Sequence, residues 1–458
     1  DSLLAMPGFV DGHSHGRGLS PLRGGLGFDH LETWLTKTSE IPSPGGYLNA
    51  AYSAIKHIRS GITGMNYLHI PSLPDEKARN SFQKSIKAFK DVGINVSAGY
   101  SVKDRNFLTY DDQKFLDNLP HDLRERTKKL IPKTTEDIPK IFSREFLELK
   151  EQYERENVPV FLAPTGPQWC SKKLLSEITE IAKTTNSKVH IHTLQTVRQK
   201  KYGERLKEGS LVKYLKETGL LETDLTLGHA IWLTQEDIDL LKKNNVSTTH
   251  HAGCNLHLRN GIAPVHNYLS NGIKVALGLD DKPLSEDEDI FQEMRLIDSL
   301  HNLASQELRS SPLSSFDVLK MATKSAGEVS GFKEYTGKLE EGAAADIVLI
   351  DRDRIEDPWV HPDLDIRDLL LHKGLSSDVK TVIVGGNIIM KDRELKTIDE
   401  EEIKSEFAEK LDESLKKESS ENLWRELQPY LTSFYESWVG ENYDPYYTVN
   451  SQLPRTKG

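Results

Sequence analysis

The sequence is poor in cysteine and has no long apolar run, and these absences exclude several classes of protein. Only Cys170 and Cys254 are present among 458 residues, too few for the disulfide framework of a small secreted domain. No segment approaches the roughly 18 consecutive apolar residues that a membrane-spanning helix needs. The first residues also lack the basic and then apolar pattern of a signal peptide. We therefore expect a cytoplasmic protein that does not enter a membrane.

An excess of basic residues is missing as well. The formal net charge is −11, which favours neither a nucleic acid nor an anionic membrane as a partner. Apolar residues make up 37% and charged residues 28% of the chain, as in ordinary globular proteins. A chain of 458 residues is long enough for a barrel of roughly 250 to 350 residues and an accessory domain.

Short apolar runs alternate with amphipathic helical stretches, which is the βαβ pattern of a parallel sheet. The stretch 47–60, for example, places Leu48, Ala51, Ile55 and Ile58 on one stripe of a helix. Further helices are predicted over residues 76–91, 171–184, 234–243 and 286–303. The predicted strands are Leu4–Gly12, Gly61–Leu68, Ile94–Ser101, Val158–Ala163, Lys188–His192, Leu225–His229, Val246–His250 and Lys274–Gly278. Eight such units predict a (β/α)8 barrel of the TIM type.

The chain changes character after Gly331. Residues 337–353 and 379–395 are typical of short antiparallel strands with turns between them. From residue 400 a strongly charged helix leads into an aromatic, proline-containing tail. We therefore divide the chain into residues 1–335 as the barrel, residues 336–397 as a small β domain, and residues 398–458 as a helical C-terminal extension.

Nearly every predicted barrel strand ends on a histidine, an aspartate or another polar group. The carboxyl ends of parallel barrel strands form the active-site face, so this placement is informative. The first strand is followed by His13 and His15, which stand two residues apart and can therefore reach one metal ion from the same side. Alone, such a pair is as often found in an ordinary surface loop. The other strand ends favour the metal site.

The fifth strand carries a second pair, His190 and His192. His192 lies nearer the mouth of the barrel and is the predicted ligand, whereas His190 is interpreted as a deeper, hydrogen-bonded neighbour. The sixth strand ends at His229 and the eighth at Asp280. A carboxylate at the last strand can bind a metal and accept a proton from water, and a histidine opposite it can polarise the scissile group.

Three imidazoles and one carboxylate leave a bound dication with net positive charge, which lowers the pKa of a bound water towards about 7. We expect one divalent cation at His13, His15, His192 and Asp280. This ligand set suits zinc, iron, manganese or cobalt, and zinc is our first candidate. The expected reaction is attack of metal-bound hydroxide on an sp2 carbon, with proton transfer by Asp280 and oxyanion stabilisation by His229.

Longer segments surround these residues and strengthen the interpretation. They are Pro7–His15 (PGFVDGHSH), Gly166–Ser171 (GPQWCS), His192, Gly228–Leu233 (GHAIWL), Asn255–Pro264 (NLHLRNGIAP) and Leu277–Asp280 (LGLD). In combination they resemble the amidohydrolase superfamily, and within it the branch of triazine hydrolases and amino-heterocycle deaminases. The resemblance covers essentially the whole chain.

The resemblance carries further expectations. In that branch one metal, often zinc or iron, is bound by the residues that match His13, His15, His192 and Asp280, and the position of His229 contacts substrate or the attacking water. Such proteins also have a small β-sandwich built from both ends of the chain. Residues 336–397 would be its C-terminal part, and its N-terminal part is expected to lie outside this numbering. Homodimers or higher homo-oligomers are the habit of the family.

One departure from the pattern affects the mechanism. Deaminases of this branch usually have a glutamate three residues after the fifth-strand histidine, where this chain has Gln195. An amide cannot shuttle a proton at neutral pH. Either Asp280 and His229 carry all proton transfer, or the substrate needs no ring protonation. The second option favours an amide, urea, carbamate or thiocarbamate, and the alternative is an amino- or chloro-heterocycle. We expect Gln195 to bind and orient the substrate.

Other candidates for substrate binding are supported by position alone. Trp169 can stack on a planar substrate, although a tryptophan in such a loop is as often a packing residue. Arg17 follows the first metal-binding pair and either binds an anionic or carbonyl oxygen or is a solvated loop residue. His250 and His251 end the seventh strand, and one of them is expected to face the barrel interior.

Two rival interpretations remain. A non-catalytic scaffold on the same fold would have lost metal ligands, whereas this sequence has all of them. A two-metal site usually needs a bridging lysine or carboxylate at the end of the fourth strand. That strand ends in Ala163-Pro164-Thr165, which favours a single metal. The sequence thus predicts a metal-dependent hydrolase that cleaves a non-peptide C–N or related bond of a small molecule.

Overall fold

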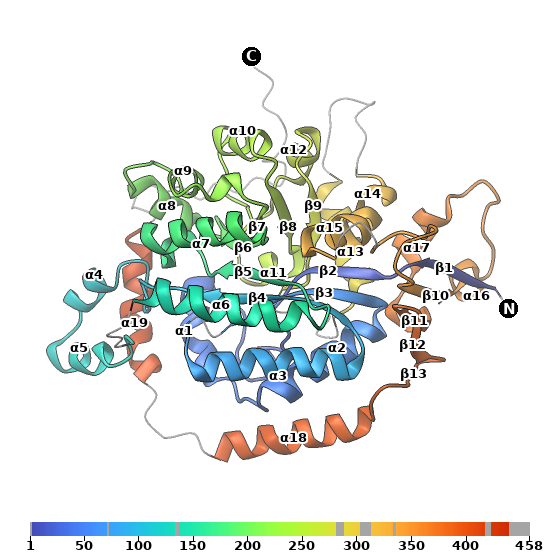
Figure 1. Cartoon of the computed structure of the whole chain (residues 1–458), viewed down its shortest axis with the longest axis horizontal. Helices are drawn as coiled ribbons and strands as arrows, with labels where there is room; N and C mark the ends of the chain where they lie inside the picture. Colours follow the sequence, from blue (N-terminus) through green and yellow to red (C-terminus); the bar gives the residue numbers. More distant parts are fainter. Residues whose placement is uncertain are drawn as a thin grey trace.

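A computed structural model of the chain contains two β-sheets and a set of helices around the larger one (Figure 1). The structure describes residues 2–70, 73–132, 137–280, 288–302, 313–332, 336–416 and 423–438. None of the helices in these ranges is long and apolar enough to cross a membrane.

The larger sheet is the predicted barrel. Its eight strands are parallel and neighbour one another in chain order. They are β2 (Phe9–Ser14), β3 (Ile62–Leu68), β4 (Asn95–Val102), β5 (Val160–Pro164), β6 (Val189–Thr193), β7 (Leu225–His229), β8 (Ser247–His250) and β9 (Val275–Leu277). All eight predicted strand regions are therefore confirmed.

The first predicted strand differs from the observed one, because the run Leu4–Gly12 is divided at Gly8. Residues before it form β1 (Leu3–Pro7) in the smaller sheet, and residues after it begin β2 of the barrel. A Cβ atom at Gly8 would lie 2.1 Å from Oγ1 of Thr63, so the chain can pass this point only without a side chain. The predicted first strand is thus two strands, one in each sheet.

Helices connect the strands and cover the outside of the barrel, as Figure 1 shows. In the first half of the chain they are α1 (Leu31–Lys37), α2 (Gly46–Arg59), α3 (Glu76–Val92), α4 (Asp112–Asp117), α5 (His121–Lys128), α6 (Ile138–Glu154), α7 (Lys172–Thr185), α8 (Val197–Arg205) and α9 (Leu211–Glu217). They continue with α10 (Gln235–Lys243), α11 (Ala252–His257), α12 (Val265–Ser270), α13 (Ile290–His301), α14 (Ser315–Lys320) and α15 (Ala326–Ser330). The predicted helices between the strands are confirmed. Of the stretch 286–303, residues 286, 287 and 303 lie outside the described ranges.

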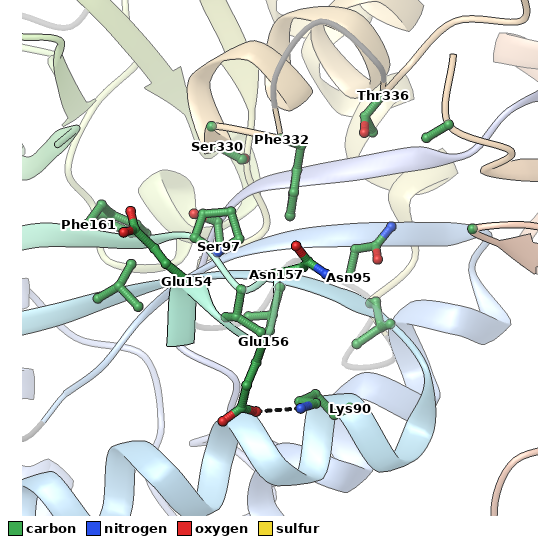
Figure 2. A pocket seen from close by; sticks show the side chains of 18 of the residues that line it. Lys90, Asn95, Ser97, Glu154, Glu156, Asn157, Phe161, Ser330, Phe332 and Thr336 are labelled. Atoms are coloured by element: carbon green, nitrogen blue, oxygen red, sulfur yellow. Dashed lines mark hydrogen bonds and ion pairs between the residues drawn. The ribbon is translucent and has the colours of Figure 1, made fainter. Parts of the chain in front are cut away.

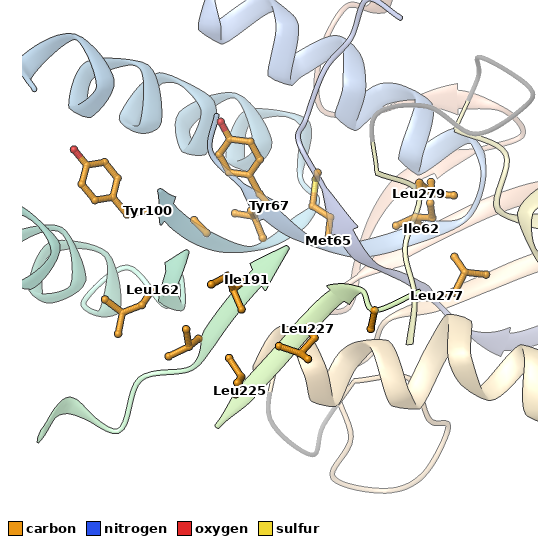
Figure 3. Close-up of a cluster of buried hydrophobic side chains, with 14 of the residues drawn as sticks. Ile62, Met65, Tyr67, Tyr100, Leu162, Ile191, Leu225, Leu227, Leu277 and Leu279 are labelled. Atoms are coloured by element: carbon orange, nitrogen blue, oxygen red, sulfur yellow. The ribbon is translucent and has the colours of Figure 1, made fainter. Parts of the chain in front are cut away.

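Alternation along the strands separates the core from the site. On β6, Val189 and Ile191 are buried in the hydrophobic core, whereas His190 and His192, which alternate with them, join a polar network. Figure 3 shows Ile191 with Leu225 and Leu227 of the neighbouring β7 in that core. The helices bury one face of each strand in this way, and the other face is left for chemistry.

The seam between the first and last barrel strands is closed by polar contacts. The backbone N–H of Asp280 donates to the carbonyl of His13 at 2.7 Å. One carboxylate oxygen of Asp11 accepts hydrogen bonds from the backbone N–H groups of Leu279 (2.9 Å) and His13 (3.0 Å). The other oxygen lies 3.0 Å from Nε2 of His57, and both side chains are fully buried. Asp11 therefore ties two strand ends and a helix together.

The smaller sheet is antiparallel, as predicted for residues 337–395. Its strand order is β1-β10-β11-β12-β13, so it includes one strand from the beginning of the chain. The new strands are β10 (Ile347–Asp351), β11 (Val379–Val384), β12 (Asn387–Lys391) and β13 (Glu394–Leu395), with helices α16 (Arg352–Glu356) and α17 (Ile366–Lys373) between the first two.

Two further helices follow this sheet, α18 (Glu400–Lys416) and α19 (Leu423–Glu436). The predicted charged helix is α18, which is joined to α2 by an ion pair between Arg59 and Glu400. Helix α19 returns to the barrel, where Gln428 donates a hydrogen bond to Oγ1 of Thr36 on α1 at 2.9 Å. The predicted aromatic tail lies outside the described residues.

The seam leads to a prediction about stability. Replacement of His57 by Ala would leave the Asp11 carboxylate buried without its ionisable partner. We expect the free energy of unfolding to fall by about 3–5 kcal/mol, measured by urea unfolding with tryptophan fluorescence. His121→Ala, at the exposed start of α5, is the matched control and should change little. Equal stability of the two variants would show that Asp11 does not depend on His57.

Candidate metal centre

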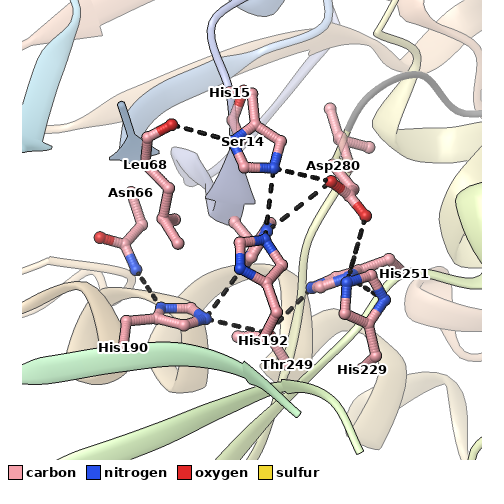
Figure 4. A network of polar contacts seen from close by, with 12 residues as sticks. Ser14, His15, Asn66, Leu68, His190, His192, His229, Thr249, His251 and Asp280 are labelled. Atoms are coloured by element: carbon pink, nitrogen blue, oxygen red, sulfur yellow. Dashed lines mark hydrogen bonds and ion pairs between the residues drawn. The ribbon is translucent and has the colours of Figure 1, made fainter. Parts of the chain in front are cut away.

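The carboxyl ends of the barrel strands bring the predicted histidines and aspartate into one cluster (Figure 4). The cluster consists of two overlapping groups whose possible ligand atoms lie within 4.8 Å of one another, one formed by His13, His15 and His192 and the other by His13, His229, His251 and Asp280. His13 belongs to both groups. The predicted ligands from three separate strand ends are thus neighbours in space.

The spacing of these atoms fits a metal ion. Nε2 of His15 and Nε2 of His192 are 3.4 Å apart, and Oδ1 of Asp280 lies 3.3 Å from Nε2 of His15 and 3.7 Å from Nε2 of His13. Ligand atoms about 2.1 Å from a tetrahedral cation would be separated by roughly 3.4 Å. These three separations are close to that value, while Asp280 lies outside the group that His13, His15 and His192 form within 4.8 Å.

Backbone carbonyls fix two of the rings with the correct nitrogen inward. Nδ1 of His15 donates to the carbonyl of Leu68 at 2.8 Å, and Nδ1 of His192 donates to the carbonyl of Thr165 at 2.9 Å. In each neutral ring the inward Nε2 then carries a lone pair. Nδ1 of His13 lies 3.0 Å from Nε2 of His190, so His190 is the deeper neighbour predicted from its position on the strand.

Buried ring nitrogens without partners point to the same conclusion. Nε2 of His13 and Nε2 of His229 are buried, and no described residue forms a hydrogen bond with either atom. Each lies within 3.7 Å of an Asp280 oxygen. An orphaned acceptor in a protein interior is costly, and a bound cation would satisfy these atoms together. The residues present therefore fit a divalent metal.

The protonation states suit a cation as well. Burial lowers the pKa of His13 and His229 well below the usual range, and it lowers the pKa of His192 to about 4 with help from the charge of His15. Burial would raise the pKa of Asp280, but contacts with His15 and His251 outweigh it and hold this pKa well below its usual value. Neutral imidazoles and an ionised carboxylate are the forms that bind metals.

His229 is held at the centre by its own network. Its Nδ1 donates to Oδ1 of Asn255 at 2.9 Å, so its inward Nε2 is an acceptor facing Oδ2 of Asp280 at 3.6 Å. Both His229 (φ 67°) and Asp280 (φ 57°) have left-handed backbone conformations, which cost side-chain-bearing residues about 1–3 kcal/mol each. Strain of this kind at the ends of β7 and β9 is typical of functional sites.

The two histidines at the end of β8 have different surroundings. Nδ1 of His251 lies 3.4 Å from Oδ2 of Asp280, and its Nε2 lies 2.9 Å from Oγ1 of Thr249. His250 is turned away, with its Nε2 3.1 Å from Nε2 of His301 on α13. Of this predicted pair, His251 therefore reaches the cluster and His250 does not, and neither is among the residues that line the pocket described next.

A pocket of about 300 Å3 opens directly onto the cluster. Its lining includes His15, His192, His229 and Asp280, together with the three predicted substrate-binding residues Arg17, Trp169 and Gln195. The walls are largely aromatic and aliphatic, from Leu31, Trp34, Leu35, Ile70, Phe107, Leu108, Tyr110, Leu258, Trp424 and Tyr435. The side-chain amide of Gln195 forms no hydrogen bond within the described residues and is free for a ligand. A planar molecule would fit such walls.

A larger cavity, of about 940 Å3, lies at the opposite end of the barrel (Figure 2). Residues that line it, such as Asn95, Val160 and Lys188, stand at the amino ends of the strands. No histidine occurs among its lining residues. Chemistry in this fold belongs to the carboxyl ends, so the smaller pocket is the candidate site.

Several supporting groups were not predicted. The backbone carbonyls of Leu68 and Thr165 could not be predicted from the sequence, because every residue has a backbone carbonyl. Asn255 could have been found, since it begins the segment NLHLRNGIAP and lies close to the seventh strand. Asp11 stands two residues before His13, and only the closed barrel shows that it reaches Leu279.

Comparisons with known proteins identify the family of this chain. The model of the family described as "Amidohydrolase family" matches residues 4–389. A 5-methylthioadenosine/S-adenosylhomocysteine deaminase of Caldanaerobacter subterraneus is 30% identical over 410 residues, which cover 87% of this chain and 84% of that protein. A 5'-deoxyadenosine deaminase of Methanosphaera stadtmanae is 29% identical over 406 residues, covering 87% and 85%.

Solved structures show the same fold. A variant of the atrazine chlorohydrolase of Arthrobacter aurescens, complexed with zinc and atraton, has a TM-score of 0.75 at 22% identity and covers 89% of this chain and 88% of its own. An adenosine deaminase of Xanthomonas campestris with bound zinc has a TM-score of 0.72 at 20% identity, with 90% and 86% covered. The match over residues 4–389 includes the whole barrel and its cluster of histidines. The chain belongs to the amidohydrolase family and is a hydrolase.

Proposed function

We propose that this hydrolase removes an amino group from a planar heterocycle of the adenine type. The observation that carries the proposal is the buried cluster of neutral imidazoles and one carboxylate, which opens into an aromatic-walled pocket. The names of the relatives, which are deaminases of adenine nucleosides, support this choice of substrate class. The pocket, of about 300 Å3, has room for a small molecule.

We propose His13, His15, His192 and Asp280 as the ligands of one divalent cation, with zinc as the first candidate because two structural neighbours contain it. When bound, such a cation supplies Lewis acidity and makes a nearby water molecule easier to deprotonate. The fixed rings of His15 and His192 would hold it without rearrangement, since their outer nitrogens already have partners.

The other residues would bind and move protons. Hydrolytic deamination exchanges an amino group for a water oxygen, so one proton must pass from water to the departing ammonia. Asp280 is the group that can carry it, because its Oδ2 faces His229 and His251 across the site. His229 would accept a hydrogen bond from the attacking water at its inward Nε2, because Asn255 holds its Nδ1–H. Trp169 would lie against the substrate ring and Gln195 would orient it.

Gln195 supports a second candidate function. Without a carboxylic acid at this position, protonation of a ring nitrogen depends on other groups. A substrate with a carbonyl centre, such as an amide, urea, carbamate or thiocarbamate, needs no such proton. Both candidates involve hydrolysis of a C–N bond by the same cluster, so they differ in substrate and not in site.

We also propose that the protein acts in the cytoplasm as a homodimer. The sequence has only two cysteines, too few for a disulfide framework, which agrees with a reducing compartment. The dimer is taken from the resemblance of the sequence to its family. Light scattering at micromolar concentration measures the mass directly.

Loss of a ligand should remove the metal. We expect His15→Ala to fall from about one zinc per chain to nearly none and to lose turnover with it. His15 is only partly buried, so the fold should survive, and circular dichroism checks this. His121→Ala is the control for a histidine outside the cluster. Full metal content in the His15→Ala protein would contradict the ligand assignment.

The substrate class is tested by ammonia release. Zinc-loaded protein is offered amino-purines, adenine nucleosides, pyrimidines, pterins and triazines, and we expect rapid release from at least one adenine nucleoside. A parallel panel contains amides, ureas and carbamates. Turnover only in the second panel would reject deamination and favour the carbonyl substrates.

Gln195 gives a separate prediction for whichever substrate is found. A lost neutral hydrogen bond is worth about 0.5–1.5 kcal/mol, so Gln195→Ala should lower kcat/KM by about 2- to 10-fold. If ring protonation limits the rate, Gln195→Glu should raise kcat on an amino-heterocycle. An unchanged kcat/KM in the Ala variant would show that the amide does not touch the substrate.

A further inference from the structure

Lys103 is a cation in the wall of the same pocket. It follows the last residue of β4, and the carbonyl of that residue, Val102, accepts a hydrogen bond from the backbone N–H of Thr165 at 3.0 Å. The carbonyl of Thr165 in turn orients His192. Lys103 therefore begins from a strand end that is joined by hydrogen bonds to the metal centre.

The ammonium of Lys103 forms no ion pair within the described residues, although the carboxylate of Asp112 attracts it. Within the same ranges no hydrogen bond or ion pair reaches this ammonium, and its Nζ lies over the ring of Phe107, 5.4 Å from the ring centroid. The carboxylates nearby in sequence accept hydrogen bonds from other groups. Asp104 accepts hydrogen bonds from the N–H (2.7 Å) and hydroxyl (2.5 Å) of Ser171, and Asp112 accepts from three backbone N–H groups.

The acidic residue across the pocket is occupied too. Glu32 accepts hydrogen bonds from the hydroxyl groups of Tyr110 and Thr196 with one oxygen, and the other oxygen lies 3.5 Å from the guanidinium of Arg198. The side chain of Glu32 is buried, so this network holds the pocket wall together. Within the described residues Glu32 forms no ion pair with Lys103.

A partly buried ammonium without a counter-ion is unfavourable, and here burial lowers the pKa of Lys103 despite the attraction of Asp112. A ligand with a negative group would offset this cost. The surrounding aromatic side chains would strengthen the attraction, because they exclude water from the pair. Arg17 lines the same pocket and adds positive potential.

We propose that Lys103 binds an anionic substituent, a carboxylate or a phosphate, carried by the substrate of this enzyme. The proposal rests on the proposed function for the identity of the reacting ring. Backbone N–H groups of Asp104 and Arg105 each donate to the carbonyl of Trp169 at 3.2 Å, so Lys103 is held beside that aromatic wall. One molecule with a planar ring and an attached anion would occupy both features.

Binding of simple anions tests the proposal without turnover. Zinc-loaded wild-type protein, Lys103→Met and Lys103→Arg are titrated with inorganic phosphate and, separately, with acetate at constant ionic strength. Fluorescence of Trp34, Trp169 and Trp424 in the pocket wall reports binding. Lys114→Met, which removes an exposed charge from the nearby α4, is the matched control. Should Lys103→Met not fold, Lys103→Gln replaces it.

We expect Lys103→Met to weaken binding of at least one probe by about 10-fold or more, as for loss of a charge-assisted hydrogen bond. Lys103→Arg and Lys114→Met should bind nearly as wild type does. The probe that loses more affinity identifies the substituent as phosphate or carboxylate. Equal affinity in Lys103→Met and wild type would overturn the proposal, since the anion would then be held by the metal or by other residues.

A kinetic comparison separates this inference from the proposed function. Deamination of 5'-deoxyadenosine, which carries no anion, is compared with that of adenosine 5'-monophosphate and of S-adenosylhomocysteine. Lys103→Met should raise KM for an anionic substrate by about 10-fold and leave KM for the neutral one unchanged. An equal change for all three would overturn the role of Lys103. If the wild type deaminates none of the three compounds, adenine deamination is rejected. The role of Lys103 is then decided by the binding experiment.

Discussion

The site depends on one carboxylate, that of Asp11, at the seam of the barrel. Parallel strands close into a barrel only where the first and last of them meet, and here the two proposed ligands His13 and Asp280 stand on either side of that seam. Asp11 accepts backbone hydrogen bonds from both sides and is itself held by His57 on α2. The distance between the two ligands is thus set by closure of the fold, before any metal binds.

Electrostatics explains why this fold can keep so many histidines together. In water, protonated imidazoles a few ångströms apart would repel one another. Burial in the barrel favours the neutral ring, and the carbonyls of Leu68 and Thr165 select the tautomer with an inward lone pair. The same burial would favour a neutral Asp280, but the imidazoles around it hold the ionised form. The cluster is therefore a set of acceptor atoms suited to binding a cation.

Much of the fold and site could be predicted because strand periodicity has chemical consequences. His190 and His192 stand two apart on a strand, so both face inward while Ile191 joins the core. The orientation of two consecutive residues is harder to predict from the sequence. Only the structure shows that His251, and not His250, reaches Asp280. Lys103 was missed because a lysine after a strand is usually solvated. Lys103 is unusual because distant segments of the chain build the pocket around it, and because the carboxylates of these segments already accept other hydrogen bonds.

Gln195 and Lys103 belong to one electrostatic argument. A glutamate at position 195 would place a negative charge in the pocket, close to the cluster, and would repel an anionic substituent. The amide removes that charge, while Lys103 and Arg17 make the remaining lining more positive. Glutamine in place of glutamate at position 195 weakens ring protonation, and it therefore also favours a negatively charged substrate. On this view the departure at residue 195 is a matter of specificity, and the proton needed for a departing amine has to travel through Asp280.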